Sequence, residues 1–107
     1  MKAFLRAFVR GMKDVLADPD GALRYVKERD ALIDETLERR RIRLAIDTVV
    51  ATPAARADGL GGVQPARFAE TVAQVTSAFD VKNPVKPESV FNASFLPPKA
   101  DRMVFPK

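Results

Sequence analysis

Apolar residues recur at three- and four-residue spacing from Phe4 to Leu16, and basic residues take most of the opposite side. This pattern predicts an amphipathic helix with one wide apolar face. Asp18 and Pro19 then end that helix and begin another, because Asp18 can cap a new helix and Pro19 suits its first position. We expect the second, shorter helix to continue to about Arg29.

Two more helices are expected further along. Asp34 is placed to cap a long third helix that runs to about Ala51, and Pro65 opens a fourth after a glycine-rich loop. Both have an apolar stripe that is typical of a buried face. The stripe of the third helix is Leu37, Ile42, Ala45, Ile46, Val49 and Val50, and that of the fourth is Phe68, Val72, Val75 and Phe79.

The composition changes after Asp80, where most of the eight prolines are found. Prolines interrupt regular secondary structure, so we expect residues 81–107 to form an extended proline-rich tail. Aromatic residues in this tail indicate that it packs on the helices or on a partner. The fold class is therefore all-α, with three to four amphipathic helices in residues 1–80 followed by the tail.

The apolar face of the first helix is a candidate interaction surface, together with apolar residues of the tail. Contiguous exposed apolar area of a few hundred Å2 marks an interaction site, and a helix face of this size reaches that order. Self-association into a homo-oligomer would cover it. The predicted face comprises Phe4, Leu5, Phe8, Met12, Val15, Leu16, Phe91, Phe95 and Leu96.

Charge and hydropathy narrow the classes of partner. The chain has 18 Lys and Arg residues against 14 Asp and Glu residues, a net charge of +4. The segment "ERRRIR" concentrates arginines, but nearby glutamates and the lack of interleaved aromatic residues favour a solvated, salt-bridged face over a nucleic-acid site. No apolar run is long enough to cross a bilayer, and Arg6, Arg10 and Lys13 interrupt any signal-peptide core, so we expect neither an integral membrane protein nor a signal peptide.

The sequence contains few residues of the types that commonly act as catalytic groups. The sequence has no histidine and no cysteine, which removes the commonest general base, the commonest metal ligand and any thiolate nucleophile. The clustered carboxylates of Asp14, Asp18 and Asp20 stand at a helix end, where capping explains them. We therefore expect no enzyme activity, no catalytic residue, no metal site and no cofactor.

Four segments in order carry a family resemblance: "AFLRAFVRGMKDVLADPDGALRYVKERD", "ALIDETLERRRIRLAIDTVVATP", "GLGGVQPARFAETVAQV" and "VFNASFLPP". Together they resemble the last third of the periplasmic substrate-binding proteins of ABC importers in the NMT1/THI5-like group. That group includes binding proteins for nitrate, for sulfonates such as taurine, and for pyrimidine precursors of thiamin. The resemblance extends from about Ala3 to Pro98.

The resemblance implies that this chain is a fragment of a two-lobed α/β periplasmic-binding-protein fold, whose parent carries a small solute to an ABC permease. It also implies that the apolar face of the first helix normally lies on strands absent from this chain. The family's ligand contacts come mostly from the missing portion, so no ligand-binding residue is assigned here. The alternative is a free-standing helical module that self-associates.

Overall fold

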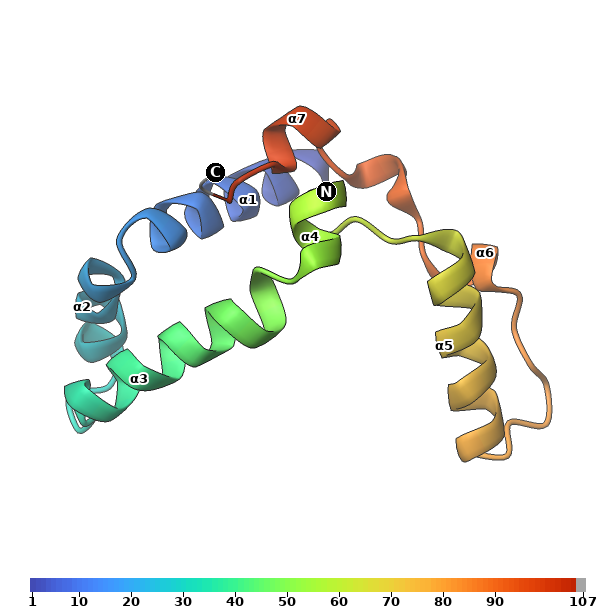
Figure 1. The fold of residues 1–107 in the computed structure, drawn as a ribbon, viewed down its shortest axis with the longest axis horizontal. Helices are drawn as coiled ribbons and strands as arrows, with labels where there is room; N and C mark the ends of the chain where they lie inside the picture. The colour runs from blue at the N-terminus through green and yellow to red at the C-terminus, as the bar shows by residue number, and fades with distance from the viewer. Residues whose placement is uncertain (106–107) are drawn as a thin grey trace.

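The computed structural model describes residues 1–105, which are all-α and contain no strand. The fold class expected from the sequence is confirmed. Four longer helices, three shorter ones and two irregular helical turns follow one another (Figure 1). They are α1 (Lys2–Ala17), α2 (Pro19–Arg29), α3 (Glu35–Ala45), the π-helical turn η1 (Ile46–Val50), α4 (Pro53–Asp58), α5 (Pro65–Ala78), α6 (Pro87–Val90), the 3-10 turn η2 (Ala93–Phe95) and α7 (Lys99–Arg102).

The predicted helix starts follow from local capping chemistry. The Asp18 carboxylate accepts a hydrogen bond from the Gly21 amide at 2.9 Å, and Asp34 does the same for the Leu37 amide at 3.1 Å. Each side chain satisfies an amide that has no partner within its own helix. Pro65 occupies the first turn of α5, where a missing N–H costs nothing.

The third helix continues past Ala45 in a different form. From Ile46 to Val50 the backbone widens into a π-helical turn, closed by a 2.7 Å hydrogen bond from the Ala51 amide to the Ile46 carbonyl. The proline-rich segment also holds short helical pieces. Pro87 stands in the first turn of α6 and Pro98 immediately precedes α7, because proline is compatible with a helix start even though it breaks a helix interior.

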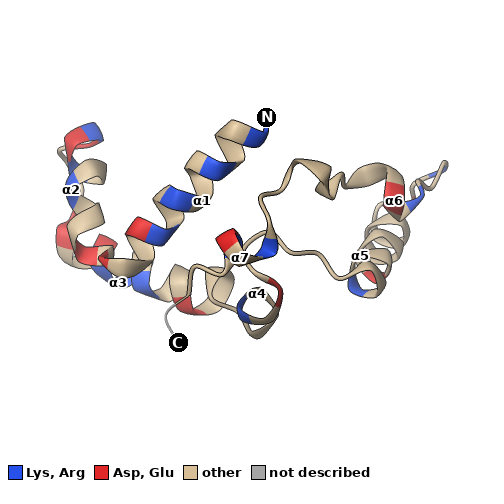
Figure 2. Ribbon diagram, turned by 90° about the horizontal axis from the view of Figure 1, so that it is seen from above, with Lys and Arg blue, Asp and Glu red and all other residues tan. Residues whose placement is uncertain are grey.

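The helices make an open arrangement instead of a closed bundle (Figure 1). Helices α1, α2 and α3 form three sides of a frame, α7 lies against the middle of α1 and beside α4, and α5 projects away with α6 beside it (Figures 1 and 2). The radius of gyration is 16.8 Å. A compact domain of this length has a radius of gyration of about 13 Å. The helices therefore bury only a small part of their surfaces against one another.

The buried apolar core is correspondingly small. In the described part of the chain it consists of Val9, Leu23, Ala51 and Val104. The expectation that the stripes of the third and fourth helices are buried is wrong: Val49 is exposed, Phe79 is 78% exposed, and α5 has no buried residue. Both stripes are regular, but the described residues cover them only in part. The half-buried members are Ile42, Ile46 and Val50 of the third helix and Phe68 and Val72 of the fourth.

Candidate interaction surface

Helix α1 presents an apolar strip to solvent. Phe4 is 65% exposed and Phe8 is 53% exposed, and Val15 continues the same strip two turns later and is half-buried. The neighbouring strip of Leu5, Met12 and Leu16 is also half-buried, because it faces the rest of the chain. The apolar face of α1 is thus divided between an inner side and an outer side.

The cations of α1 lie away from Phe4 and Phe8. Lys2, Arg6, Arg10 and Lys13 follow one another along the helix (Figure 2). The last three line a shallow groove of about 310 Å³ with Val9 and the C-terminal segment around Pro97 and Ala100. The C-terminal segment therefore covers the basic side of α1 and leaves the phenylalanine strip uncovered.

Gly11 lies within the exposed strip of α1, in the helix interior. A glycine there destabilises a helix by about 0.5–1 kcal/mol relative to alanine. Nothing in the structure explains it, because a Cβ atom built at Gly11 has no neighbour within 4 Å. Because no contact within the structure requires a glycine at this position, its presence is consistent with close approach by a surface outside this chain.

A second apolar surface lies between α5 and the segment that follows it. Phe68 of α5 contacts Phe91 with ring centroids 6.1 Å apart, and both line a groove of about 560 Å³ together with Val63, Leu96 and Lys99. Three of the polar side chains at this groove pair with one another. Asp58 pairs with Lys99 at 3.7 Å and accepts a hydrogen bond from Gln64 at 2.8 Å.

The nine residues of the predicted face therefore lie on two separate surfaces. Those in the first helix belong to the two strips of α1, whereas Phe91 and Leu96 belong to the α5 groove. Phe95 is exposed in η2. In both ribbon views α6 lies far from α1 (Figures 1 and 2), so the structure does not bring the two groups together.

Arg102 has a role that the sequence analysis missed. It is 9% exposed, and its guanidinium donates to three carbonyl oxygens: Pro97 at 3.0 Å, Asp58 at 3.2 Å and Leu60 at 2.9 Å. Two of these acceptors are more than forty residues away in sequence. No motif marks such a contact, because the acceptors are backbone atoms.

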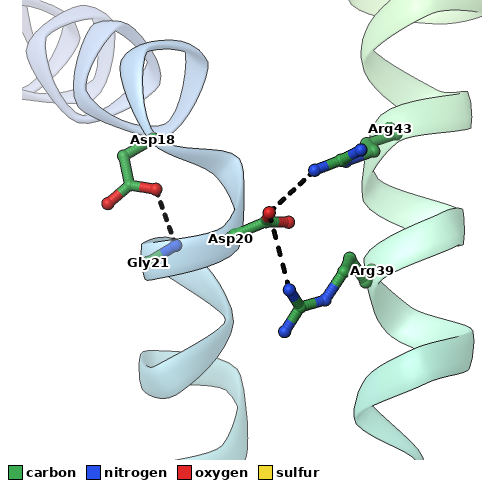
Figure 3. Close-up of polar contacts among 5 residues, drawn as sticks. All are labelled: Asp18, Asp20, Gly21, Arg39 and Arg43. Atoms are coloured by element: carbon green, nitrogen blue, oxygen red, sulfur yellow. Dashed lines mark hydrogen bonds and ion pairs between the residues drawn. The ribbon is translucent and has the colours of Figure 1, made fainter.

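The arginine-rich segment of α3 serves to join helices. Asp20 of α2 accepts a hydrogen bond from Arg43 at 2.7 Å and pairs with Arg39 at 3.5 Å (Figure 3). Arg41 pairs within α3 with Glu38 at 2.6 Å. This agrees with a salt-bridged face, although the main acceptor for Arg39 and Arg43 comes from another helix.

A second ion pair joins the start of α3 to α2. Lys27 donates a hydrogen bond to the Glu35 carboxylate, and this bond lowers the pKa of Glu35 below its ordinary value. The positive charge of Lys27 acts in the same direction. On α2, the hydrogen bond from Arg24 to the Tyr25 hydroxyl raises the pKa of Arg24, so this side chain remains charged.

The exposed area is large for the mass of the chain. The structure exposes 8368 Å2. A compact monomer of this mass exposes about 5,900 Å2, so the excess is about 2,500 Å2. A standard protein–protein interface buries about 800 Å2 on each partner. The excess is thus large enough for at least one complete interface.

Other kinds of site receive no support from the geometry. Within residues 1–105, no three carboxylates gather where they could hold a metal ion. No helix in that range combines the length and the apolar character needed to cross a membrane. Comparison with protein-family models found no matching family, and comparisons with curated proteins and with solved structures found no match either.

Proposed function

We propose that this chain is the C-terminal helical part of a solute-binding protein that serves an ABC importer. Its parent protein would bind a small sulfonate, nitrate or a pyrimidine-like solute in the periplasm and deliver it to the permease. The ordered resemblance of four segments supports the family. The observation that carries the proposal is the exposed strip of Phe4 and Phe8, on a chain that exposes 8368 Å2.

Uncovered helix faces are what a helical layer presents when its other layer is missing. An amphipathic helix must bury its apolar stripe against another element to be stable in water. Within residues 1–105 no such element covers the outer strip of α1 or the C-terminal half of α5, as the exposure of Phe8 and Phe79 indicates. A lobe that supplies the missing layer would cover both.

In this proposal the chain acts without chemistry of its own. In the groove beside α5, Asp58 is paired with Lys99 and Gln64 and the Arg102 guanidinium donates to backbone carbonyls, so these charges are already engaged within the chain. Solute contacts would come from the remainder of the parent. The chain therefore contributes structure to the binding protein and no catalysis.

The proposal is tested on the native gene product. An antibody raised against this chain would be used to find that product in fractionated source cells, and the purified product would be titrated calorimetrically with taurine, nitrate and a thiamin pyrimidine precursor. We expect a periplasmic protein of about three times this length that binds one of these solutes. A protein of this length in another fraction, or one that binds none of them, would overturn the proposal.

A further inference from the structure

The groove between α1 and the C-terminal segment gathers positive charge. Arg6, Arg10 and Lys13 line its α1 wall, and residues in and beside α7 line the other wall. Asp101 is the one acidic residue among the described residues of this lining, so three cations face one carboxylate and the groove has a net charge of +2. Val9, which also lines the groove, is buried. The cations therefore stand around a concave surface and not on a fully solvated helix face.

The three cations of the groove have no partner within the described part of the chain. Among residues 1–105, no ion pair or side-chain hydrogen bond involves Arg6, Arg10 or Lys13. Asp14 stands one turn from Arg10 but lines a different groove, beside α2. The arginines of α3 differ, because three of them pair with carboxylates. The charge of the α1 groove is thus available to a ligand.

The order of charges along α1 is unfavourable for the helix itself. Arg6 and Arg10 stand four residues apart and Arg10 and Lys13 three, so like charges are neighbours on one side of the helix. The first turn of α1 has no acidic residue, although the first turns of α2 and α3 have them. Acids there complement the helix dipole, and cations oppose it. Helix stability therefore does not account for this row of cations, and a bound anion would relieve the repulsion.

The wall opposite α1 is held in place by Arg102. The Arg102 guanidinium donates to the Pro97 carbonyl at 3.0 Å and to the carbonyls of Asp58 and Leu60. Pro97 and Met103, at the two ends of the α7 segment, both line the groove. A site whose walls are fixed before the ligand arrives loses less free energy to ordering when the ligand binds.

We propose that this groove binds a small anion with two or more linked phosphates, whose oxygens are contacted by Arg6, Arg10 and Lys13. A guanidinium group matches the geometry of phosphate oxygens and can donate two parallel hydrogen bonds to them. The three residues extend over about 10 Å of the helix axis, so linked phosphates fit this row better than one isolated phosphate. The groove volume of about 310 Å³ suits a small molecule.

This proposal goes beyond the proposed function, because it assigns a ligand to residues of this chain. A nucleic-acid strand fits the groove less well. None of the described residues that line the groove is aromatic, so they offer no ring on which a base could stack. A lipid surface also fits less well, because the exposed Phe4 and Phe8 lie on a different side of α1 from the cations.

Calorimetric titration of the purified chain with tripolyphosphate tests the site. We expect one site per chain, with an affinity about tenfold higher than that for inorganic phosphate, because more charge is neutralised. Arg10→Ala and Lys13→Ala should each weaken binding by about tenfold, and Asp101→Asn should strengthen it because it removes the carboxylate of the groove. Arg40→Ala is the matched control, since Arg40 is an exposed cation of α3, and it should leave the affinity unchanged. Circular dichroism confirms that each variant keeps its helices.

Three results would overturn the proposal. The first is no binding of tripolyphosphate. The second is an equal loss for Arg40→Ala and Arg10→Ala, which would indicate general attraction to a basic chain. The third is a single-stranded oligonucleotide that binds more tightly than tripolyphosphate and is weakened by Arg10→Ala, which would assign the groove to nucleic acid. Each of them leaves the proposed function standing, because that function places the solute contacts in the remainder of the parent and is tested on the native gene product.

Discussion

Arg102 and Leu60 are joined by two reciprocal hydrogen bonds. The Leu60 amide donates to the Arg102 carbonyl at 2.9 Å, and the Arg102 guanidinium donates to the Leu60 carbonyl, also at 2.9 Å. This pair fixes α7 to the turn that follows α4. Nearby, the Arg56 guanidinium lies over the Phe105 ring at 5.4 Å. The C-terminal segment is thus part of the fold and holds α4 in place.

Replacing Arg102 by alanine should destabilise the chain strongly. The substitution removes three charge-assisted hydrogen bonds and leaves buried carbonyls without donors, which corresponds to about 2–4 kcal/mol in the free energy of unfolding. Urea denaturation followed by circular dichroism measures the loss. Arg67→Ala is the control, because the Arg67 side chain makes no hydrogen bond or ion pair in the described part of the chain. Equal losses for the two variants would contradict the role of Arg102.

Replacing Gly59 by any other residue should destabilise the chain. Its backbone has φ +80 and ψ 162, a region that only glycine readily occupies, and a Cβ atom there would stand 3.0 Å from Cβ of Arg102. We expect both Gly59→Ala and Gly59→Asn to lower the free energy of unfolding by about 1–3 kcal/mol. Gly61→Asn is the comparison, since a Cβ atom at Gly61 meets only Cδ2 of Leu96, at an ordinary 3.4 Å. The melting temperature of Gly61→Asn should therefore lie closer to that of the unsubstituted chain than the melting temperatures of the two Gly59 variants.

Asp20 should join α2 to α3 through electrostatics. Asp20→Asn removes the charge that pairs with Arg43 and Arg39, and partly exposed pairs of this kind contribute about 0.2–1 kcal/mol each. The loss in unfolding free energy should shrink as salt concentration rises, because ions screen the pairs. Asp47→Asn, on an exposed turn, should show little effect at either salt concentration. A loss for Asp20→Asn that salt does not change would argue against the ion pairs.

The Lys27–Glu35 pair should make stability depend on pH. The pKa of Glu35 is lowered from its ordinary 4.5, so its contribution is fully present above about pH 4.5 and disappears as the pH falls through the lowered folded-state value. Stability should therefore decline below that pH. Glu35→Gln should flatten this part of the pH profile in urea titrations, and an unchanged profile would show that other carboxylates cause the decline.

Local signals in the sequence were sufficient to predict the longer helices. Asp18 and Asp34 each accept a hydrogen bond from an amide three residues on, and Pro65 acts at its own position in the first turn, so local sequence determines these helix starts. The short helices α6 and α7 in the proline-rich segment were not expected. Proline breaks a helix interior, but Pro87 and Pro98 stand at helix starts, where proline is favourable.

Whether an apolar residue is buried was harder to predict, because burial depends on which other elements pack against its helix. The spacing of Phe68, Val72, Val75 and Phe79 is that of a core-facing helix, yet Phe79 is exposed. Periodicity shows that a face is apolar and does not show what covers it. The hydrogen bonds from Arg102 to the carbonyls of Asp58 and Leu60 could not be predicted either, because every residue has a backbone carbonyl and the sequence does not mark which ones accept.

The central claim is that the outer strip of α1 is covered in the native protein. Labelling of an introduced thiol with a maleimide tests this most directly, because the chain has no cysteine of its own. Gly11→Cys would be placed in the native gene, with Ser77→Cys as the exposed reference, and both would be labelled in intact protein and after denaturation. We predict that position 11 reacts far more slowly than position 77 until the protein is unfolded. Equal reaction rates in the intact protein would mean that the strip is open to solvent, and would contradict the account.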